Sequence, residues 1–249
     1  MRCPLPEGEV TRVVSLVPSL TEAIAVTRPA ALVGATDWCT HPRDLDVSRV
    51  RGTKNPDVAR IVDLAPELVV VNKEENRELD VRRLREARIP VWVTVIEDVP
   101  QALESMTRLF GTALGWGIPP WLVEARRLWS GPVPKTIARV AVPIWRDPWM
   151  VVGSATFTGD LLAHTGLANV FGDHPQRYPR LDLIEIDRGD IDAVLLPDEP
   201  YEFSATDGPE AFHAAPTRLV SGRLLTWYGP SLVRARSTLD ELARELGGG

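Results

Sequence analysis

The fold is decided by the stretch TRVVSLVPSLTEAIAVT, residues 11–27. Residues 11–17 are apolar and β-branched over a short span, which predicts a buried strand. Ser19 is followed three residues later by Glu22, the spacing of a capping box, so a helix is predicted from Ser19 to about Thr27. A buried strand that leads into a helix is the repeating unit of a parallel sheet.

The same alternation of short apolar runs and amphipathic runs continues along the chain. It predicts mostly parallel sheets with helices on their faces. Further strands are predicted over residues 31–35, 67–72, 89–95, 138–144, 149–152, 193–196 and 223–225. Further helices are predicted over residues 56–64, 78–87, 99–114, 119–129, 159–165, 183–187 and 231–246.

The two halves of the chain resemble each other. IVDLAPELVVV (residues 61–71) and LIEIDRGDIDAVLLP (residues 183–197) both place a short helix, a turn and a buried strand in the same order. We therefore expect an α/β fold of two similar lobes, residues 1–97 and 132–249. A helical segment, residues 98–131, bridges them, and the ligand cleft is expected between the lobes.

Composition excludes several classes of protein. A net charge of −6 offers no basic footprint for nucleic acid, and no run approaches the roughly 20 apolar residues of a membrane span. The two cysteines form no disulfide framework. Cys39 and His41 supply only two of the three or four ligands that zinc needs, so no metal site is predicted.

The first ten residues contain prolines and acids and no apolar run. As the sequence stands, it predicts a cytoplasmic protein. An extracytoplasmic location is the alternative if a leader has been removed.

Sequence motifs of common enzymes are missing. No G-x-G-x-x-G follows a strand, and neither a P-loop nor a G-x-S-x-G elbow occurs. An enzyme that uses Asp37, Cys39 and His41 as a reactive loop stays open as an alternative.

Aromatic residues give the strongest signal of function, because the chain has eight Trp but only three Tyr. Five aromatic residues lie at or beyond predicted strand ends, where loops of α/β proteins rim a ligand crevice. We expect them to be exposed and to stack on a flat ligand. Arg146 is expected to pair with ligand carboxylates, and helix N-termini at Ser19 and Thr158 to donate hydrogen bonds. The five aromatic residues are Trp38, Trp145, Trp149, Trp227 and Tyr228.

A family resemblance extends over about residues 11–245. Among the strings that carry it are RVVSLVPSLTEAI (12–24), GATDWCTHP (34–42), WRDPWMVVGSATFTGDLLAHTGLANVFGD (145–173) and LLTWYGP (224–230). They resemble the class III periplasmic-type solute-binding proteins of ABC importers, in the branch that binds vitamin B12. The resemblance implies a non-enzymatic, monomeric binding protein without an intrinsic cofactor. Its ligand is expected to be bulky and metal-bearing, a corrinoid first and a siderophore or haem second.

The resemblance also implies roles for individual residues. The ligand-stacking aromatics of the family fall at Trp38 and Trp227, and Asn72 replaces a third cleft aromatic. Family members dock on an ABC permease through a surface glutamate on each lobe, which corresponds to Glu78 and Glu202 here. A cytosolic carrier or sensor that has kept the fold is the other alternative.

Overall fold

A computed structural model describes residues 4–248, which divide into two compact units. Unit 1 contains the chain up to Ile96, Pro100–Ala125 and Tyr228–Pro230. Unit 2 contains Glu97–Val99, Arg126–Trp227 and the chain from Ser231 onward. The helices of the predicted bridge are therefore shared between the units: α4 (Val99–Arg108) belongs almost entirely to unit 1, and α5 (Pro120–Trp129) continues from unit 1 into unit 2.

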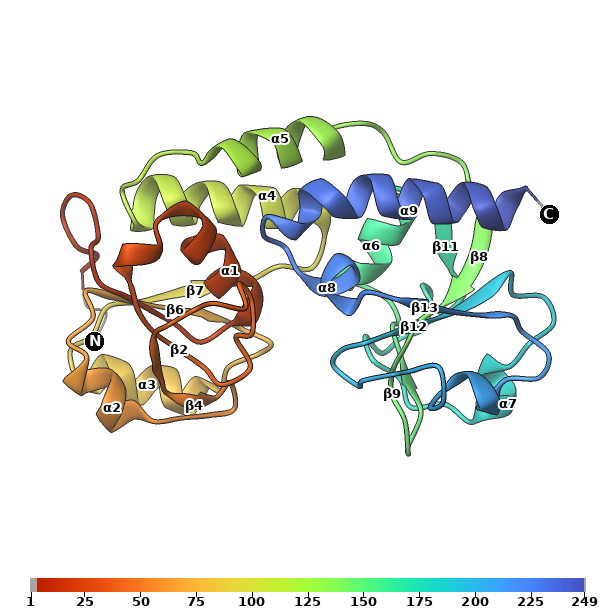
Figure 1. The fold of residues 1–249 in the computed structure, drawn as a ribbon, viewed down its shortest axis with the longest axis horizontal. Helices are drawn as coiled ribbons and strands as arrows, with labels where there is room; N and C mark the ends of the chain where they lie inside the picture. Colours follow the sequence, from red (N-terminus) through yellow and green to blue (C-terminus); the bar gives the residue numbers. More distant parts are fainter. Residues whose placement is uncertain (1–3, 249) are drawn as a thin grey trace. The chain divides into compact units, whose positions relative to one another are not determined.

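Unit 1 is built on a five-stranded parallel sheet with the order β3-β2-β1-β6-β7. Figure 1 shows α2 and α3 on one face of this sheet and α1 and α4 on the other. A π-helical turn, Leu109–Ala113, extends α4. The strands are β1 (Val13–Ser15), β2 (Leu32–Ala35), β3 (Ser48–Arg49), β6 (Leu68–Asn72) and β7 (Val91–Thr94), with a small hairpin of β4 (Arg51–Gly52) and β5 (Asn55–Pro56); the helices are α1 (Pro18–Thr27), the 3-10 turn η1 (Pro29–Ala31), α2 (Val58–Asp63) and α3 (Glu78–Glu86).

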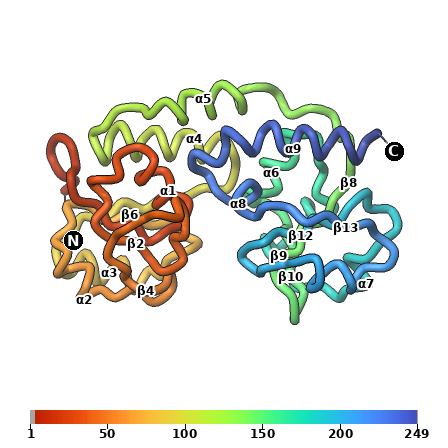
Figure 2. Tube along the Cα trace, in the orientation of Figure 1, coloured from red at the N-terminus to blue at the C-terminus, as the bar shows by residue number. Residues whose placement is uncertain are grey.

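Unit 2 is built on a four-stranded parallel sheet with the order β11-β8-β12-β13. An antiparallel hairpin of β9 and β10 lies on the side of this sheet that carries α7 (Figure 2). The strands are β8 (Ala138–Ala141), β9 (Pro143–Trp145), β10 (Met150–Val151), β11 (Leu167–Asn169), β12 (Ala193–Pro197) and β13 (Thr217–Val220); the helices are α6 (Phe157–Ala163), α7 (Leu183–Ile186), the 3-10 turn η3 (Pro209–Ala211), α8 (Gly222–Thr226) and α9 (Ser231–Gly247).

The central strands of both sheets are buried along their whole length. All five residues of β6 and all five of β12 are buried. Strands that are covered on both faces are continuous apolar runs, which is why the sequence locates them well. The prediction of two α/β lobes with mostly parallel sheets is confirmed.

The predicted capping box at Ser19 is wrong. Helix α1 begins at Pro18, its N-cap is Val17, and no side chain caps it. Proline at the first helical position needs no partner for its nitrogen and already has a helical φ. Ser19 is consequently a buried residue inside the first turn.

The predicted strand at residues 223–225 is also wrong, because these residues belong to α8. The strand lies just before them, in β13, an edge strand whose residues are half-buried or exposed. The apolar pair Leu224 and Leu225 imitates a short buried strand, whereas β13 has no clear alternation of apolar residues.

Within residues 4–248, no helix has both the length and the apolar character needed to cross a membrane. The same residues contain no cluster of three or more His, Cys, Asp or Glu side chains arranged to hold a metal ion.

Candidate functional site

Trp38 stands in the loop that follows β2 in unit 1, at the carboxyl end of the parallel sheet. Its side chain is 67% exposed. A Cβ atom at Gly52 would lie 3.1 Å from the indole Nε1, so the absence of a side chain at Gly52 lets the indole approach β4. Trp38 thus presents a broad aromatic surface to solvent while resting on the backbone.

The loop that carries Trp38 is ordered by hydrogen bonds from the Arg49 side chain. The Arg49 guanidinium donates hydrogen bonds to three of its carbonyl oxygens, at distances of 3.0, 2.8 and 3.2 Å. These oxygens belong to Thr36, Cys39 and Leu45. A loop that is ordered before binding loses less conformational entropy when a ligand arrives.

Cys39 anchors the same loop. Its Sγ atom lies 3.0 Å from the Thr21 hydroxyl and 3.1 Å from the Thr36 hydroxyl. Burial raises the pKa of the Cys39 thiol, which keeps it protonated at neutral pH. Because the thiolate is the nucleophilic form, a buried thiol of this kind does not suit the alternative in which Asp37, Cys39 and His41 form a reactive loop.

Asn72, at the end of β6, is occupied by contacts within unit 1. Its Nδ2 donates to the Thr94 hydroxyl at 3.1 Å, and its Oδ1 accepts the Glu74 amide at 2.8 Å. Asn76 completes this network: its Oδ1 accepts the Asn72 amide, and its Nδ2 donates to the carbonyls of Leu16 and Thr53. Asn76 organises three loops at the carboxyl edge of the sheet, a role that no motif in the sequence predicts.

Tyr228 belongs to unit 1 although it lies near the C-terminus. The side chain is buried, so the expectation that it is exposed is wrong. Burial, together with the nearby Glu75 charge, holds the pKa of the Tyr228 phenol well above its usual value. The next residue, Gly229, has no room for a side chain, because a Cβ there would lie 2.9 Å from the Ser19 carbonyl oxygen.

In unit 2, Trp145 ends β9 and is 44% exposed. Its ring meets Tyr201 edge to face, with 5.6 Å between ring centroids. The Tyr201 hydroxyl donates a 2.7 Å hydrogen bond to Asp207 Oδ2. The ring of Trp145 thus packs against Tyr201 and remains partly open to solvent.

The Arg146 guanidinium, expected to be available to a ligand carboxylate, already pairs with two acidic side chains. Its Nη1 donates to Asp207 and to Glu210, and these contacts raise the pKa of the guanidinium. The guanidinium also lies 5.6 Å from the ring centroid of Trp149. Arg146 therefore ties the β9–β10 hairpin to the loop that follows β12.

Trp149 is not an exposed aromatic residue either. It is 9% exposed and lies in the core of unit 2. Its ring stacks on Phe203 with 5.9 Å between centroids and 7° between planes, and it meets Phe212 edge to face. Trp149 lies in the turn between β9 and β10, directly before Met150.

Trp227 follows α8 and is buried, again against expectation. The Arg223 guanidinium lies 5.8 Å from its ring centroid. The prediction that Trp38 and Trp227 face one crevice stays a prediction, since each is placed within its own unit.

Thr158, expected at the N-terminus of a helix as a donor to the ligand, lies inside the first turn of that helix. Helix α6 begins at Phe157, and its N-cap is Thr156, whose side chain accepts the Gly159 amide. The Thr158 hydroxyl is buried and donates to the Leu225 carbonyl at 3.1 Å. Thr158 thus joins α6 to α8 and does not point its hydroxyl at solvent.

The two predicted docking residues are both exposed. Glu78 is the first residue of α3, where the helix dipole favours an acid. Glu202 lies in the loop after β12.

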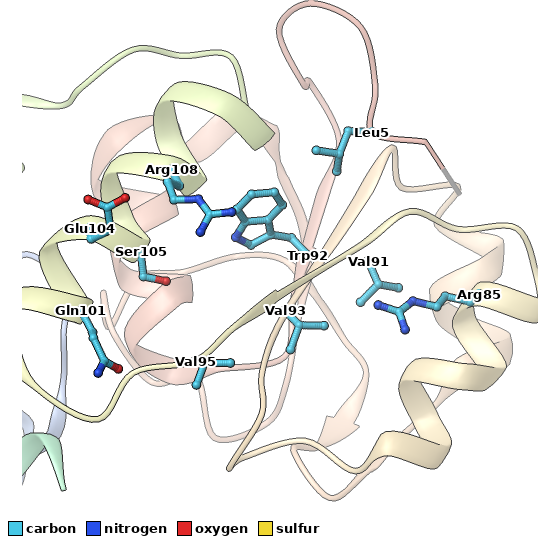
Figure 3. Close-up of a pocket in the computed structure, with 10 residues that line it drawn as sticks. All are labelled: Leu5, Arg85, Val91, Trp92, Val93, Val95, Gln101, Glu104, Ser105 and Arg108. Atoms are coloured by element: carbon cyan, nitrogen blue, oxygen red, sulfur yellow. The ribbon is translucent and has the colours of Figure 1, made fainter. Parts of the chain in front are cut away.

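A groove of about 540 Å³ runs along the outer edge of β7 in unit 1. Figure 3 shows Val93 and Val95 from the strand side and Gln101 and Ser105 from α4. The Arg108 guanidinium lies 5.8 Å from the ring centroid of Trp92. No residue that the sequence predicts for ligand binding lines this groove.

Comparison with known proteins places the fold. No family model matches the chain. A vitamin B12-binding protein of Pectobacterium carotovorum subsp. carotovorum (strain PC1) is 21% identical over 204 residues, which cover 78% of this chain and 74% of that protein. The crystal structure of the periplasmic vitamin B12-binding protein BtuF of Vibrio cholerae superposes with a TM-score of 0.76 at 14% identity, covering 96% of this chain and 99% of the other. The chain has the class III periplasmic binding-protein fold.

A haem-binding protein shares this fold equally well. The periplasmic haem-binding protein from Pseudomonas aeruginosa superposes with a TM-score of 0.76 at 20% identity, covering 96% of this chain and 94% of the other. These class III relatives are named for the ligands they bind and not for reactions. The comparisons thus agree with the expectation of a binding protein and not of an enzyme.

Proposed function

We propose that this chain is a non-enzymatic solute-binding protein of the ABC-importer type, with a corrinoid as its first candidate ligand and haem or a ferric siderophore as the second. The observation that carries the proposal is the exposed Trp38 indole on an internally ordered loop at the carboxyl end of the unit 1 sheet. Similarity to a B12-binding and a haem-binding protein supports this class of ligand. The metal in such a ligand is cargo and not a cofactor of the protein.

Trp38 and Trp145 are the residues we assign to stacking. Both are exposed; the Trp38 indole nitrogen lies close to Gly52, and the Trp145 ring meets Tyr201 edge to face. Each such aromatic contact is worth about 1–3 kcal/mol in a desolvated site. Ordered loops add affinity because little entropy is lost on binding.

Calorimetric titration of the full chain with cyanocobalamin, hemin and ferrioxamine tests the proposal. We expect one of them to bind with a Kd below about 10 µM, and Trp38→Ala to weaken it about 10- to 100-fold. Val123→Ala, at an exposed position of α5, is the matched control and should bind as the wild type does. A concentration of about 100 µM is high enough to detect weak binding. If none of the three compounds binds at that concentration, the proposal is wrong.

The importer role requires a permease that recognises the protein. We assign the docking contacts to Glu78 and Glu202, since both carboxylates are exposed and surface charges can steer association. Glu78→Lys and Glu202→Lys should slow uptake by cells of the source organism while leaving calorimetric affinity unchanged. Unchanged uptake in the double variant would favour a carrier or sensor. Fractionation of those cells with an antibody to the protein tests in which compartment it resides.

A further inference from the structure

Asp198 and Glu199, which follow β12, contact the first turn of α8. Asp198 Oδ1 accepts the amide of Gly222 at 2.6 Å. A Cβ atom at Gly222 would lie 2.4 Å from Glu199 Cγ and 2.6 Å from the Glu199 carbonyl oxygen, so only glycine permits this approach. The first turn of α8 therefore rests directly on Asp198 and Glu199.

The Glu199 carboxylate contacts the residues that end α8. It accepts a hydrogen bond from the Trp227 side chain and is attracted by Arg223, while the Thr226 hydroxyl donates to the Gly222 carbonyl. Arg223 in turn lies over the Trp227 ring. The second carboxylate oxygen, Oε1, is buried and has no hydrogen-bond partner among the described residues.

The charge of Glu199 is sensitive to pH near neutrality. Burial and the neighbouring Asp198 raise the pKa of the Glu199 carboxyl to about 7, against the opposing effect of Trp227, Arg223 and Thr226. The charged groups that face it are Asp198 from its own segment and Arg223 from α8. Ionised, it attracts Arg223; protonated, it loses that attraction and is a weaker acceptor for the indole.

We propose that Glu199 is a positioning residue whose ionised carboxylate holds Trp227 and Arg223 in place, and that its protonation loosens this hold and weakens solute binding. The part that concerns solute binding rests on the proposed function and on the further prediction, implied by the family resemblance, that Trp227 stacks on the ligand. The part that concerns Trp227 does not, because it follows from contacts within unit 2.

The first experiment needs no ligand. The fluorescence of Trp227, taken as the difference between wild type and Trp227→Phe, is followed from pH 5.5 to 8.5. We expect a sigmoidal change with a midpoint near 7, the pH set by the Glu199 carboxyl. Glu199→Gln should abolish the change, and Glu199→Asp should retain one. Glu241→Gln, at an exposed position of α9, should leave it as in wild type. A flat wild-type profile, or an unaltered midpoint in Glu199→Gln, would overturn the proposal.

The second experiment measures cyanocobalamin affinity at pH 6 and pH 8. We expect wild-type binding to be about 10-fold weaker at pH 6 than at pH 8, because the ionised fraction of a carboxyl with a pKa of about 7 changes about 10-fold between these pH values. In Glu199→Gln we expect binding to be independent of pH. If cyanocobalamin, hemin and ferrioxamine all fail to bind while the fluorescence titration persists, the proposed function fails and the positioning role stands. If a compound binds with the same affinity at both pH values, the coupling to binding is overturned.

Discussion

The hydroxyl of Tyr228 donates a 3.0 Å hydrogen bond to Oε1 of Glu75, a residue 153 positions earlier in the chain. Both residues belong to unit 1, to which only residues 228–230 of the C-terminal part contribute. This contact and the close approach of Gly229 to Ser19 return the chain to the first sheet just before α9 begins. Tyr228 is therefore part of the framework of unit 1.

Tyr228→Phe removes only the hydroxyl. We expect the free energy of unfolding to fall by about 1 kcal/mol, the usual net value of one hydrogen bond. Glu75 is half-buried and can recover water, which limits the loss. Urea denaturation followed by circular dichroism measures the change. Tyr178→Phe, at a more exposed tyrosine, is the control and should change stability by less. Equal effects of the two variants would contradict the role assigned to Tyr228.

Gly52→Ala is expected to displace Trp38 without unfolding unit 1. The added methyl group would lie 2.6 Å from Asn55 Oδ1, so that side chain must shift, and 3.1 Å from the Trp38 indole nitrogen, so the indole must move by a few tenths of an ångström. We expect a changed near-ultraviolet circular dichroism spectrum together with a higher Kd for the ligand that calorimetry identifies. Gly131→Ala, where nothing lies within 4 Å of the new atom, is the matched control. If the Gly52→Ala protein binds the ligand as tightly as wild type, Trp38 does not contact the ligand.

Trp145 and Trp149, four residues apart, are expected to respond in opposite ways. Trp149→Ala removes a core side chain that stacks on Phe203 and should cost about 3–5 kcal/mol of stability. Trp145→Ala removes an exposed ring and should cost less than about 1 kcal/mol, while weakening ligand binding. Denaturation and calorimetry on both variants check the pair. A Trp145 variant with normal affinity would leave unit 2 without a stacking residue.

How far the sequence predicts this protein depends on how local the determining contacts are. Buried parallel strands such as β6 and β12 are continuous apolar runs, and the sequence places them correctly. Exposure of the loop aromatics is decided by distant partners. Trp38 and Trp145 are open, whereas Trp149 is covered by Phe203 and Phe212, which lie more than fifty positions later in the chain. Spacing alone carries no information about such partners.

Arg146 illustrates the same limit, and it leads to a test. Because its Nη1 already pairs with Asp207 and Glu210, it is not expected to recognise a ligand carboxylate. Should hemin bind, Arg146→Gln should change the affinities for hemin and for its dimethyl ester by the same factor. Calorimetric titration of both compounds provides the measurement. A loss confined to the free acid would restore the contact that the sequence predicts.

Glu199 should make the protein more stable in mild acid than above neutral pH. Its pKa is raised from 4.5 to about 7 in the folded protein, so between these values the folded state binds more protons than the unfolded state. Stability contributed by this group therefore falls as pH rises from about 4.5 through 7, by up to about 3 kcal/mol for a shift of this size. Urea denaturation at pH 5.5 and 8.5 in wild type and Glu199→Gln checks the sign. The variant should lose most of the difference between the two pH values, and Glu241→Gln should keep it. Wild-type protein that is more stable at pH 8.5, with Glu199→Gln unchanged in that respect, would show that the carboxyl ionises at its ordinary pKa.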